Sequence, residues 1–348
     1  MVRSGINFLL LSVLLLCAFP ARAEDVSQAN KIKTYALLTA DRVSGTSDLA
    51  LVLTVKNGPE ILNTLAASVV GGQTLLAEYD KWYEELFALT YLTGDYSRLW
   101  KSLRAHNEKM TGQFLAPDMI QAVRGVDLLI VADRDFPFPA DVFRVNGQWL
   151  FEIAPIIHTV GVPESIPDLS DAYDYKDVLI LDCQGPDDRE GAEAPGVAAF
   201  LDNAGISHKF LVTLTSLSAE KALEEYSADV LHLATHANPD EFFPGRGKSG
   251  IAAARLMQLP TRFRTVLSTG CNTGHPVFAH AMLDDGTRFF IASMYKTSGK
   301  DGIVFGGDFY THLFSGKTPF ESFYEVKKRI TGKQPDYPDI LRFVFYAK

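Results

Sequence analysis

A cysteine and a histidine each end an apolar run in the second half of the chain. Cys271 follows the run 266–270 (Val-Leu-Ser-Thr-Gly), and His236 closes the run 230–235 (Val-Leu-His-Leu-Ala-Thr). The carboxyl ends of parallel strands meet at one edge of an open sheet, where ligands bind. Two such ends on neighbouring strands bring a thiol close to an imidazole, and a cysteine nucleophile with a histidine base requires this arrangement. The spacing therefore predicts a hydrolase whose nucleophile is a cysteine.

Two glycines flank the cysteine and suggest how a developing oxyanion is stabilised. Gly270 permits a close approach of the backbone, and Gly274 permits a sharp exit into a helix expected over 275–283. Backbone N–H groups at the start of that helix would favour a thiolate and an oxyanion alike. Three side chains could orient the imidazole, and the sequence does not choose among them: Asn272, Asp240 and Glu241.

Two other interpretations of Cys271 stay open at this point. A free cysteine is often a buried core residue, and Cys271 could be one. An exported pair of cysteines could also form a disulfide, here between Cys183 and Cys271. Both residues are expected to end core strands of one sheet, and a disulfide needs Cα atoms within about 7 Å. The glycine-flanked turn and the histidine together favour the nucleophile.

The first residues have the form of a secretory signal. Arg3 gives a positive start, residues 8–19 are almost wholly apolar, and Ala21-Arg22-Ala23 fits a small-x-small cleavage site. We expect cleavage after Ala23 and a periplasmic or secreted mature protein. A lipid anchor on Cys17 is disfavoured because Leu16 precedes it, where a small residue is wanted. No later stretch is long enough to span a membrane.

Composition limits the classes of partner. The net charge of −9 argues against binding to nucleic acid or to an anionic membrane. The 47% hydrophobic content is ample for a large core. The cysteines are too few for a structural zinc site and no His-Glu-x-x-His pattern is present, so neither a metal nor a cofactor is expected. The expected partner is a protein or peptide substrate.

Alternating strand and helix patterns predict an α/β fold with a mostly parallel sheet. The predicted strands are 34–40, 49–55, 126–132, 177–183, 230–236, 265–270, 289–294 and 342–346, and the first two form a hairpin. The predicted helices are 71–90, 97–115, 194–203, 218–226, 275–283 and 307–330. The aperiodic, Pro- and Asp-bearing stretch 163–175 indicates a boundary. The domains expected are a signal peptide (1–23), an N-terminal α/β half (24–168) and a catalytic half (172–348).

The runs 231–236 (Leu-His-Leu-Ala-Thr-His) and 267–274 (Leu-Ser-Thr-Gly-Cys-Asn-Thr-Gly) closely resemble the signature runs of CHAT domains. These are caspase-like proteins related to separase, gingipains, clostripain and metacaspases. The resemblance covers roughly Tyr35 to the end of the chain. Supporting segments are 127–143, 150–157, 305–313, 318–328 and 343–346.

The resemblance implies a caspase-like αβα sandwich in which Cys271 is the nucleophile and His236 the base. It also implies oxyanion donors on the backbone of Ala237 and of Cys271. Two residues depart from the family pattern: Ala237 stands where glycine is usual, and Gly270 stands where alanine is usual. If position 237 requires a positive φ, alanine is strained there and activity would be lost.

Asp182 and Asp187 follow the first strand of the second half. Such carboxylates could line a pocket for a basic substrate side chain, although a capping role is equally compatible with their position.

The function predicted from these observations is an exported cysteine endopeptidase that forms a thioester acyl-enzyme. A catalytically silent CHAT-like binding module is the alternative, motivated by Ala237. A hydrolase of the class I glutamine amidotransferase type is a further rival. In that type the histidine normally follows the cysteine, whereas His236 precedes Cys271 here.

Overall fold

The structure, a computed structural model, describes residues 32–171, 173–185, 193–245, 249–260, 262–283, 287–297, 299–333 and 341–348. The expected signal peptide, Cys17 and Asp187 lie outside these residues. Within the described ranges, no helix combines the length and apolar character needed to cross a bilayer.

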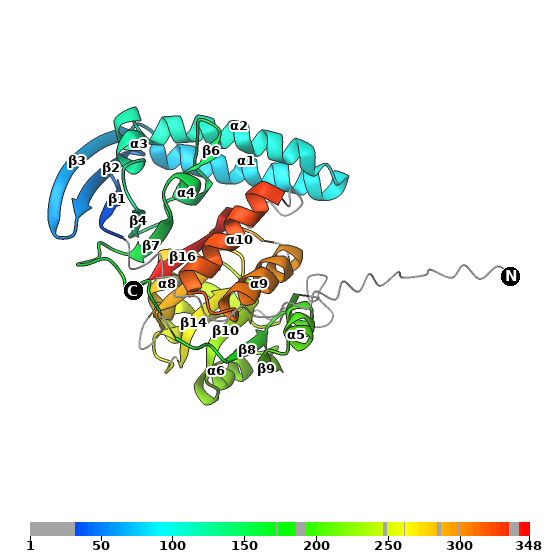
Figure 1. The fold of residues 1–348 in the computed structure, drawn as a ribbon. Helices are drawn as coiled ribbons and strands as arrows, with labels where there is room; N and C mark the ends of the chain where they lie inside the picture. The colour runs from blue at the N-terminus through cyan, green and yellow to red at the C-terminus, as the bar shows by residue number, and fades with distance from the viewer. Residues whose placement is uncertain are drawn as a thin grey trace.

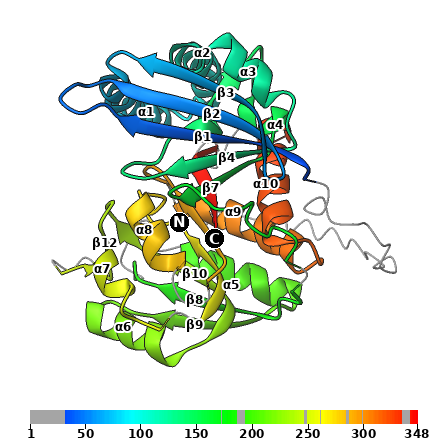
Figure 2. The same ribbon diagram turned by 90° about the vertical axis from the view of Figure 1, so that its left-hand side faces the viewer.

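One eleven-stranded sheet runs through both halves of the chain, in the order β3-β2-β1-β4-β7-β16-β15-β14-β10-β8-β9. In Figure 2 the labelled strands of this sheet follow the same order, from β3 near the top to β9 at the bottom. Most neighbours are parallel, as predicted, but β16 is antiparallel to β15 and parallel to β7. The last strand therefore joins two parallel blocks that run in opposite directions.

The N-terminal half contributes one block of strands and a pair of long helices. Its strands in the large sheet are β1 (Thr34–Arg42), β2 (Leu49–Asn57), β3 (Glu60–Val69), β4 (Leu128–Asp133) and β7 (Ile156–Val160). Its helices are α1 (Gly72–Thr93), α2 (Tyr96–Phe114), α3 (Pro117–Val123) and α4 (Leu150–Ile153), with a 3₁₀ turn η2 (Ala140–Val142) and the short hairpin β5 (Arg144–Val145) and β6 (Gln148–Trp149). The predicted hairpin is confirmed, because β1 and β2 pair antiparallel along their whole length.

The C-terminal half contributes the second block of strands. Its strands in the large sheet are β8 (Asp177–Asp182), β9 (Ser207–Val212), β10 (Ala228–Ala234), β14 (Phe263–Ser268), β15 (Phe289–Ser293) and β16 (Phe343–Ala347). Its helices are α5 (Glu193–Ala204), α6 (Ser216–Glu225), α7 (Ala253–Leu256), α8 (Pro276–Leu283), α9 (Gly299–Leu313) and α10 (Pro319–Lys333). A small second sheet holds β11 (His236–Ala237), β12 (Glu241–Phe243) and β13 (Ile251–Ala252).

Helices cover both faces of the second block, so the predicted αβα sandwich is confirmed (Figure 1). Alternate residues of a strand point to opposite faces. Accordingly, Ile180 packs in the core beneath α5, α9 and α10, whereas Leu179 and Leu181 pack in the core beneath α6, α7 and α8. Because both faces of these strands are buried, their sequences are nearly continuous apolar runs.

The helical region predicted over 307–330 consists of two separate helices, α9 and α10. Gly316 has φ +95, a conformation that ends a helical path. Thr318 then starts a new helix: its hydroxyl accepts a bond from the Glu321 N–H at 3.2 Å, and its own N–H donates to the Glu321 carboxylate at 3.0 Å. This reciprocal pair is a capping box followed by proline at the first helical position.

Candidate active site

The register of β10 on β14 relates His236 to Cys271. The two strands are parallel neighbours, with Val230 opposite Thr265 and Leu233 opposite Ser268. The pairing ends at Leu233 and Ser268, and His236 and Cys271 each follow their strand's last paired residue by three positions. Both residues are partly exposed, as side chains at an open sheet edge should be.

Close packing holds these two strand ends together. The Thr269 N–H and hydroxyl both donate to the Leu233 carbonyl, at 3.1 and 3.2 Å. A Cβ placed on Gly270 would lie 2.8 Å from Thr235 Cγ2 and 3.2 Å from Ala237 Cβ. The two residues that flank His236 thus press against the residue before Cys271, and only glycine allows this approach.

The segment after Cys271 is a tight loop held against β15. Asn272 adopts a left-handed conformation with φ +61, and its N–H donates to the Tyr295 carbonyl at 3.0 Å. The Gly274 N–H donates to the Ser293 carbonyl at 2.8 Å. A Cβ on Gly274 would lie 2.9 Å from the Met294 nitrogen, so glycine is required at that position as well.

The helix predicted over 275–283 is present as α8, and a tight loop separates it from Cys271. Helix α8 begins at Pro276, beyond the loop, and the N–H groups of Asn272 and Gly274 are already bonded to carbonyls. Those donors therefore stabilise the loop rather than a negative charge at the thiol.

The two described cysteines, Cys183 and Cys271, have different surroundings, and neither is in a disulfide. The disulfide considered from the sequence is therefore not formed. The Cys271 Sγ is a weak donor to the Thr297 carbonyl at 3.9 Å, which sets the segment after β15 beside the thiol. Cys183 is fully buried 3.2 Å from the Thr213 hydroxyl, and burial raises the pKa of its thiol to about 12. Cys183 is thus an inert core residue.

Ala237 lies in strand β11, which pairs antiparallel with β12. Among the described residues, the non-glycine residues with positive φ are Asn146 and Asn272. Position 237 therefore does not need the left-handed region, and alanine is unstrained there. The role of its N–H as an oxyanion donor stays a prediction.

Asp182 ends β8 as predicted, but its carboxylate is buried in a turn. It accepts hydrogen bonds from the N–H groups of Gln184 at 2.9 Å and Gly185 at 3.1 Å. This is capping geometry, which shields the carboxylate from a substrate in this conformation. Its proposed pocket companion, Asp187, is not among the described residues.

Among the described residues, no group of three or more His, Cys, Asp or Glu side chains could hold a metal ion.

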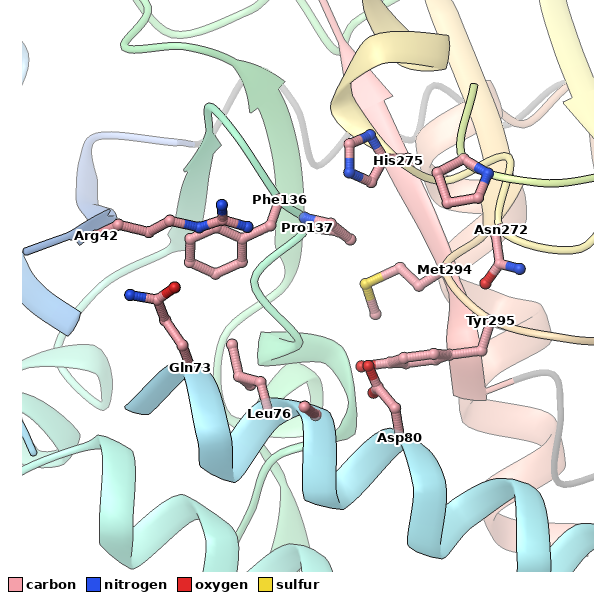
Figure 3. A pocket seen from close by; sticks show the side chains of 12 residues that line it. Arg42, Gln73, Leu76, Asp80, Phe136, Pro137, Asn272, His275, Met294 and Tyr295 are labelled. Carbon is pink, nitrogen blue, oxygen red and sulfur yellow. The ribbon is translucent and has the colours of Figure 1, made fainter. Parts of the chain in front are cut away.

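A cavity of about 280 Å³ adjoins the cysteine loop and is lined by both halves of the chain (Figure 3). The C-terminal half contributes Asn272, and the N-terminal half contributes Asp80 on α1. Burial raises the pKa of Asp80 to about 6, against the lowering effects of a hydrogen bond from Tyr295 and of the nearby Arg342 charge. Sequence reasoning missed Asp80 as a candidate site residue, although the preceding residue, Tyr79, is one of the apolar residues that α1 buries in the core.

A second histidine, His158, lies in a fully buried cluster of charges at the junction of the two halves. Its Nδ1 is 2.7 Å from the Asp133 carboxylate, and its Nε2 is 2.7 Å from that of Asp141. Lys327 of α10 also pairs with Asp141. Burial alone lowers the pKa of His158, but the two carboxylates outweigh it and raise the pKa to about 9.

The buried cluster reaches the cysteine loop through one hydroxyl. The Tyr346 hydroxyl lies 2.7 Å from the Asp133 carboxylate and 2.9 Å from the Gly274 carbonyl. Sequence reasoning missed this cluster because its members are widely separated in the chain and form no motif.

Comparison with solved structures identifies the fold of this chain. Two crystal structures of the Saccharomyces cerevisiae separase–securin complex match this chain, with TM-scores of 0.54 and 0.53 and sequence identities of 10% and 9%. Each match covers 92% of this chain but only 30% of the separase chain. No protein-family model and no curated protein matches the sequence. The chain therefore has the caspase-like fold of separase, a cysteine protease.

Proposed function

We propose that this protein is a cysteine endopeptidase in which Cys271 is the nucleophile and His236 the base. The observation that carries the proposal is the parallel pairing of β10 with β14, because His236 and Cys271 each follow the last paired residues, Leu233 and Ser268, by three positions. The packing of Thr235 and Ala237 against Gly270 supports it. The resemblance of both signature runs to CHAT domains supports the same assignment.

The proposed chemistry has two steps. His236 takes the thiol proton, and the Cys271 thiolate attacks the peptide carbonyl. The N–H groups of Ala237 and Cys271 stabilise the oxyanion, which collapses to a thioester as the amine leaves with the proton from His236. Water, deprotonated by His236, then hydrolyses the thioester and returns the thiol.

The substrate class we propose is a protein or an exposed protein segment. The solved separase structures are complexes with another protein, securin. The cavity beside Asn272 is an open, mixed polar and apolar hollow of the kind that accepts a side chain.

A library of peptide acyloxymethylketones tests the proposal. The purified protein is incubated with the library, and the labelled residues are mapped by mass spectrometry. We expect labelling at Cys271 that is lost in the His236→Ala variant, because the imidazole activates the thiol. The preferred probe would then report the side chain that the enzyme selects.

A catalytically silent binding module is the second candidate. The observation that favours it is that the N–H groups of Asn272 and Gly274 are bonded to the carbonyls of Tyr295 and Ser293, which leaves fewer donors for an oxyanion. Failure of every probe at Cys271, together with ready alkylation of that thiol by iodoacetamide, would select this alternative.

We further propose that the protein is exported after cleavage behind Ala23. The apolar run 8–19 and the Ala-Arg-Ala sequence carry this proposal. Fractionation of the producing cells and N-terminal sequencing of the exported form test it. A chain that stays in the cytoplasm with Met1 or Val2 at its N-terminus contradicts it.

A further inference from the structure

The segment 294–297 lies between the cysteine loop and the N-terminal half. On one side, the Tyr295 carbonyl accepts the Asn272 N–H at 3.0 Å, and the Thr297 carbonyl faces the Cys271 thiol at 3.9 Å. The position of this segment thus sets the position of the proposed nucleophile.

On its other side, the same segment is held by Arg342, which is 1% exposed. The Arg342 Nη1 donates to the Lys296 carbonyl at 2.7 Å. The Arg342 carbonyl accepts the Met294 N–H at 3.1 Å. One residue at the start of β16 therefore binds the segment through both its side chain and its backbone.

Helix α1 of the N-terminal half completes the support. The Arg342 guanidinium lies over the Tyr83 ring at 2.9 Å from the centroid and beside the Tyr295 ring at 5.1 Å. The two rings are nearly parallel, with an interplanar angle of 10°. Asp80, which precedes Tyr83 by about one turn of α1, receives a hydrogen bond from the Tyr295 hydroxyl, and Figure 3 shows the Asp80 and Tyr295 side chains end to end.

We propose that Arg342 is a positioning residue for Cys271, and that α1 completes the active site through Tyr83 and Asp80. This inference rests on the proposed peptidase function. Only a planar guanidinium both stacks on the tyrosine rings and reaches the Lys296 carbonyl. The N-terminal half then acts as part of the enzyme, because it fixes the segment against which the cysteine loop is bonded.

The test compares Arg342→Lys and Tyr83→Leu with the control Arg329→Lys. The control makes the same exchange at an ion pair between Arg329 on α10 and Asp308 on α9. For each folded variant we would measure kcat and KM on the best peptide substrate and the labelling rate of Cys271. A misplacement of about 1 Å costs roughly 100-fold in rate, so we expect a fall of that order in kcat and labelling, with KM nearly unchanged. The control should match the parent protein.

Hydrogen exchange at the Asn272 and Gly274 amides separates this inference from the proposed function. Both amides are bonded to the segment and its flank, so they should exchange faster in Arg342→Lys and Tyr83→Leu than in the control. Parent-like exchange and labelling in the folded variants overturn the positioning role. If the parent protein is never labelled, the peptidase proposal fails while the exchange data still decide the positioning role. If Arg342→Lys does not fold, Tyr83→Leu decides.

Discussion

His158 and His236 lie on strands in the two halves of the molecule, and their surroundings differ. His158 is fully buried between two carboxylates, with a lysine beyond them, and its pKa is raised to about 9. His236 follows a strand end at the open edge, where it is partly exposed. A charged imidazole with two partners serves stability, whereas a partly exposed imidazole at a strand end has the solvent access that the proposed proton transfer requires.

Cys183 and Cys271 differ in burial in the same way as the two histidines. Cys183 ends β8 under complete burial, and its raised pKa keeps it protonated. Cys271 follows β14, where the tight glycine-bearing loop leaves its side chain partly exposed. Residue type alone therefore does not mark a reactive group, because the environment at the strand end decides it.

Replacing each cysteine in turn should give the largest contrast. Cys271→Ala should lower peptide turnover by at least about 10⁴-fold, because loss of a nucleophile removes the covalent route. Cys183→Ala should keep turnover and lose only about 1–2 kcal/mol of unfolding free energy. Peptide cleavage assays and urea titrations measure both effects. Full activity in folded Cys271→Ala would refute the assigned nucleophile.

Removing the buried lysine should destabilise the fold strongly. Lys327→Met leaves two buried carboxylates, Asp133 and Asp141, to share the charge of His158, which should cost about 3–5 kcal/mol of unfolding free energy. The matched control is Lys221→Met, which breaks an exposed pair with Glu225 at 3.6 Å and should change stability by less than about 0.5 kcal/mol. Denaturant titrations of the two variants measure the difference, and equal values would contradict a structural role for the cluster.

The cluster should also make stability depend on pH. The pKa of His158 rises from 6.5 to about 9 on folding, so its contribution is complete below pH 6.5 and is lost as the pH rises through 9. We expect the unfolding free energy to fall over this range by an amount on the order of 3 kcal/mol. Urea titrations at intervals from pH 6 to 9.5 measure it. A flat profile would show that His158 is neutral in the folded protein.

The smallest effect expected is that of a methyl group in the cysteine loop. Gly274→Ala sets a Cβ against the Ser293 and Met294 backbone at 2.9 Å, which should cost about 1–3 kcal/mol and slow the labelling of Cys271. Gly112→Ala in α2 is the control, because nothing lies within 4 Å of its Cβ position. That change should be neutral or stabilise by up to about 1 kcal/mol. Thermal denaturation compares the two, and the control result checks that alanine as such is harmless.

The strands easiest to predict were those buried on both faces. Residues 177–183 and 265–270 read as apolar runs, and β8 and β14 lie there with ends shifted by one or two residues. Strand β9 was missed because its residues are half-buried or exposed at the sheet edge. Strand β3 was missed for the same reason, since most of its side chains face solvent.

The sequence by itself determined the alternating α/β architecture and the placement of His236 and Cys271 at the ends of apolar runs. Both follow from local periodicity, which short stretches of chain express. Only the tertiary structure decided that β16 joins two opposed strand blocks, that His158 meets Asp133 and Asp141, and that Arg342 meets Tyr83. These contacts link residues far apart in the chain, and burial and packing bring them together without leaving a local pattern.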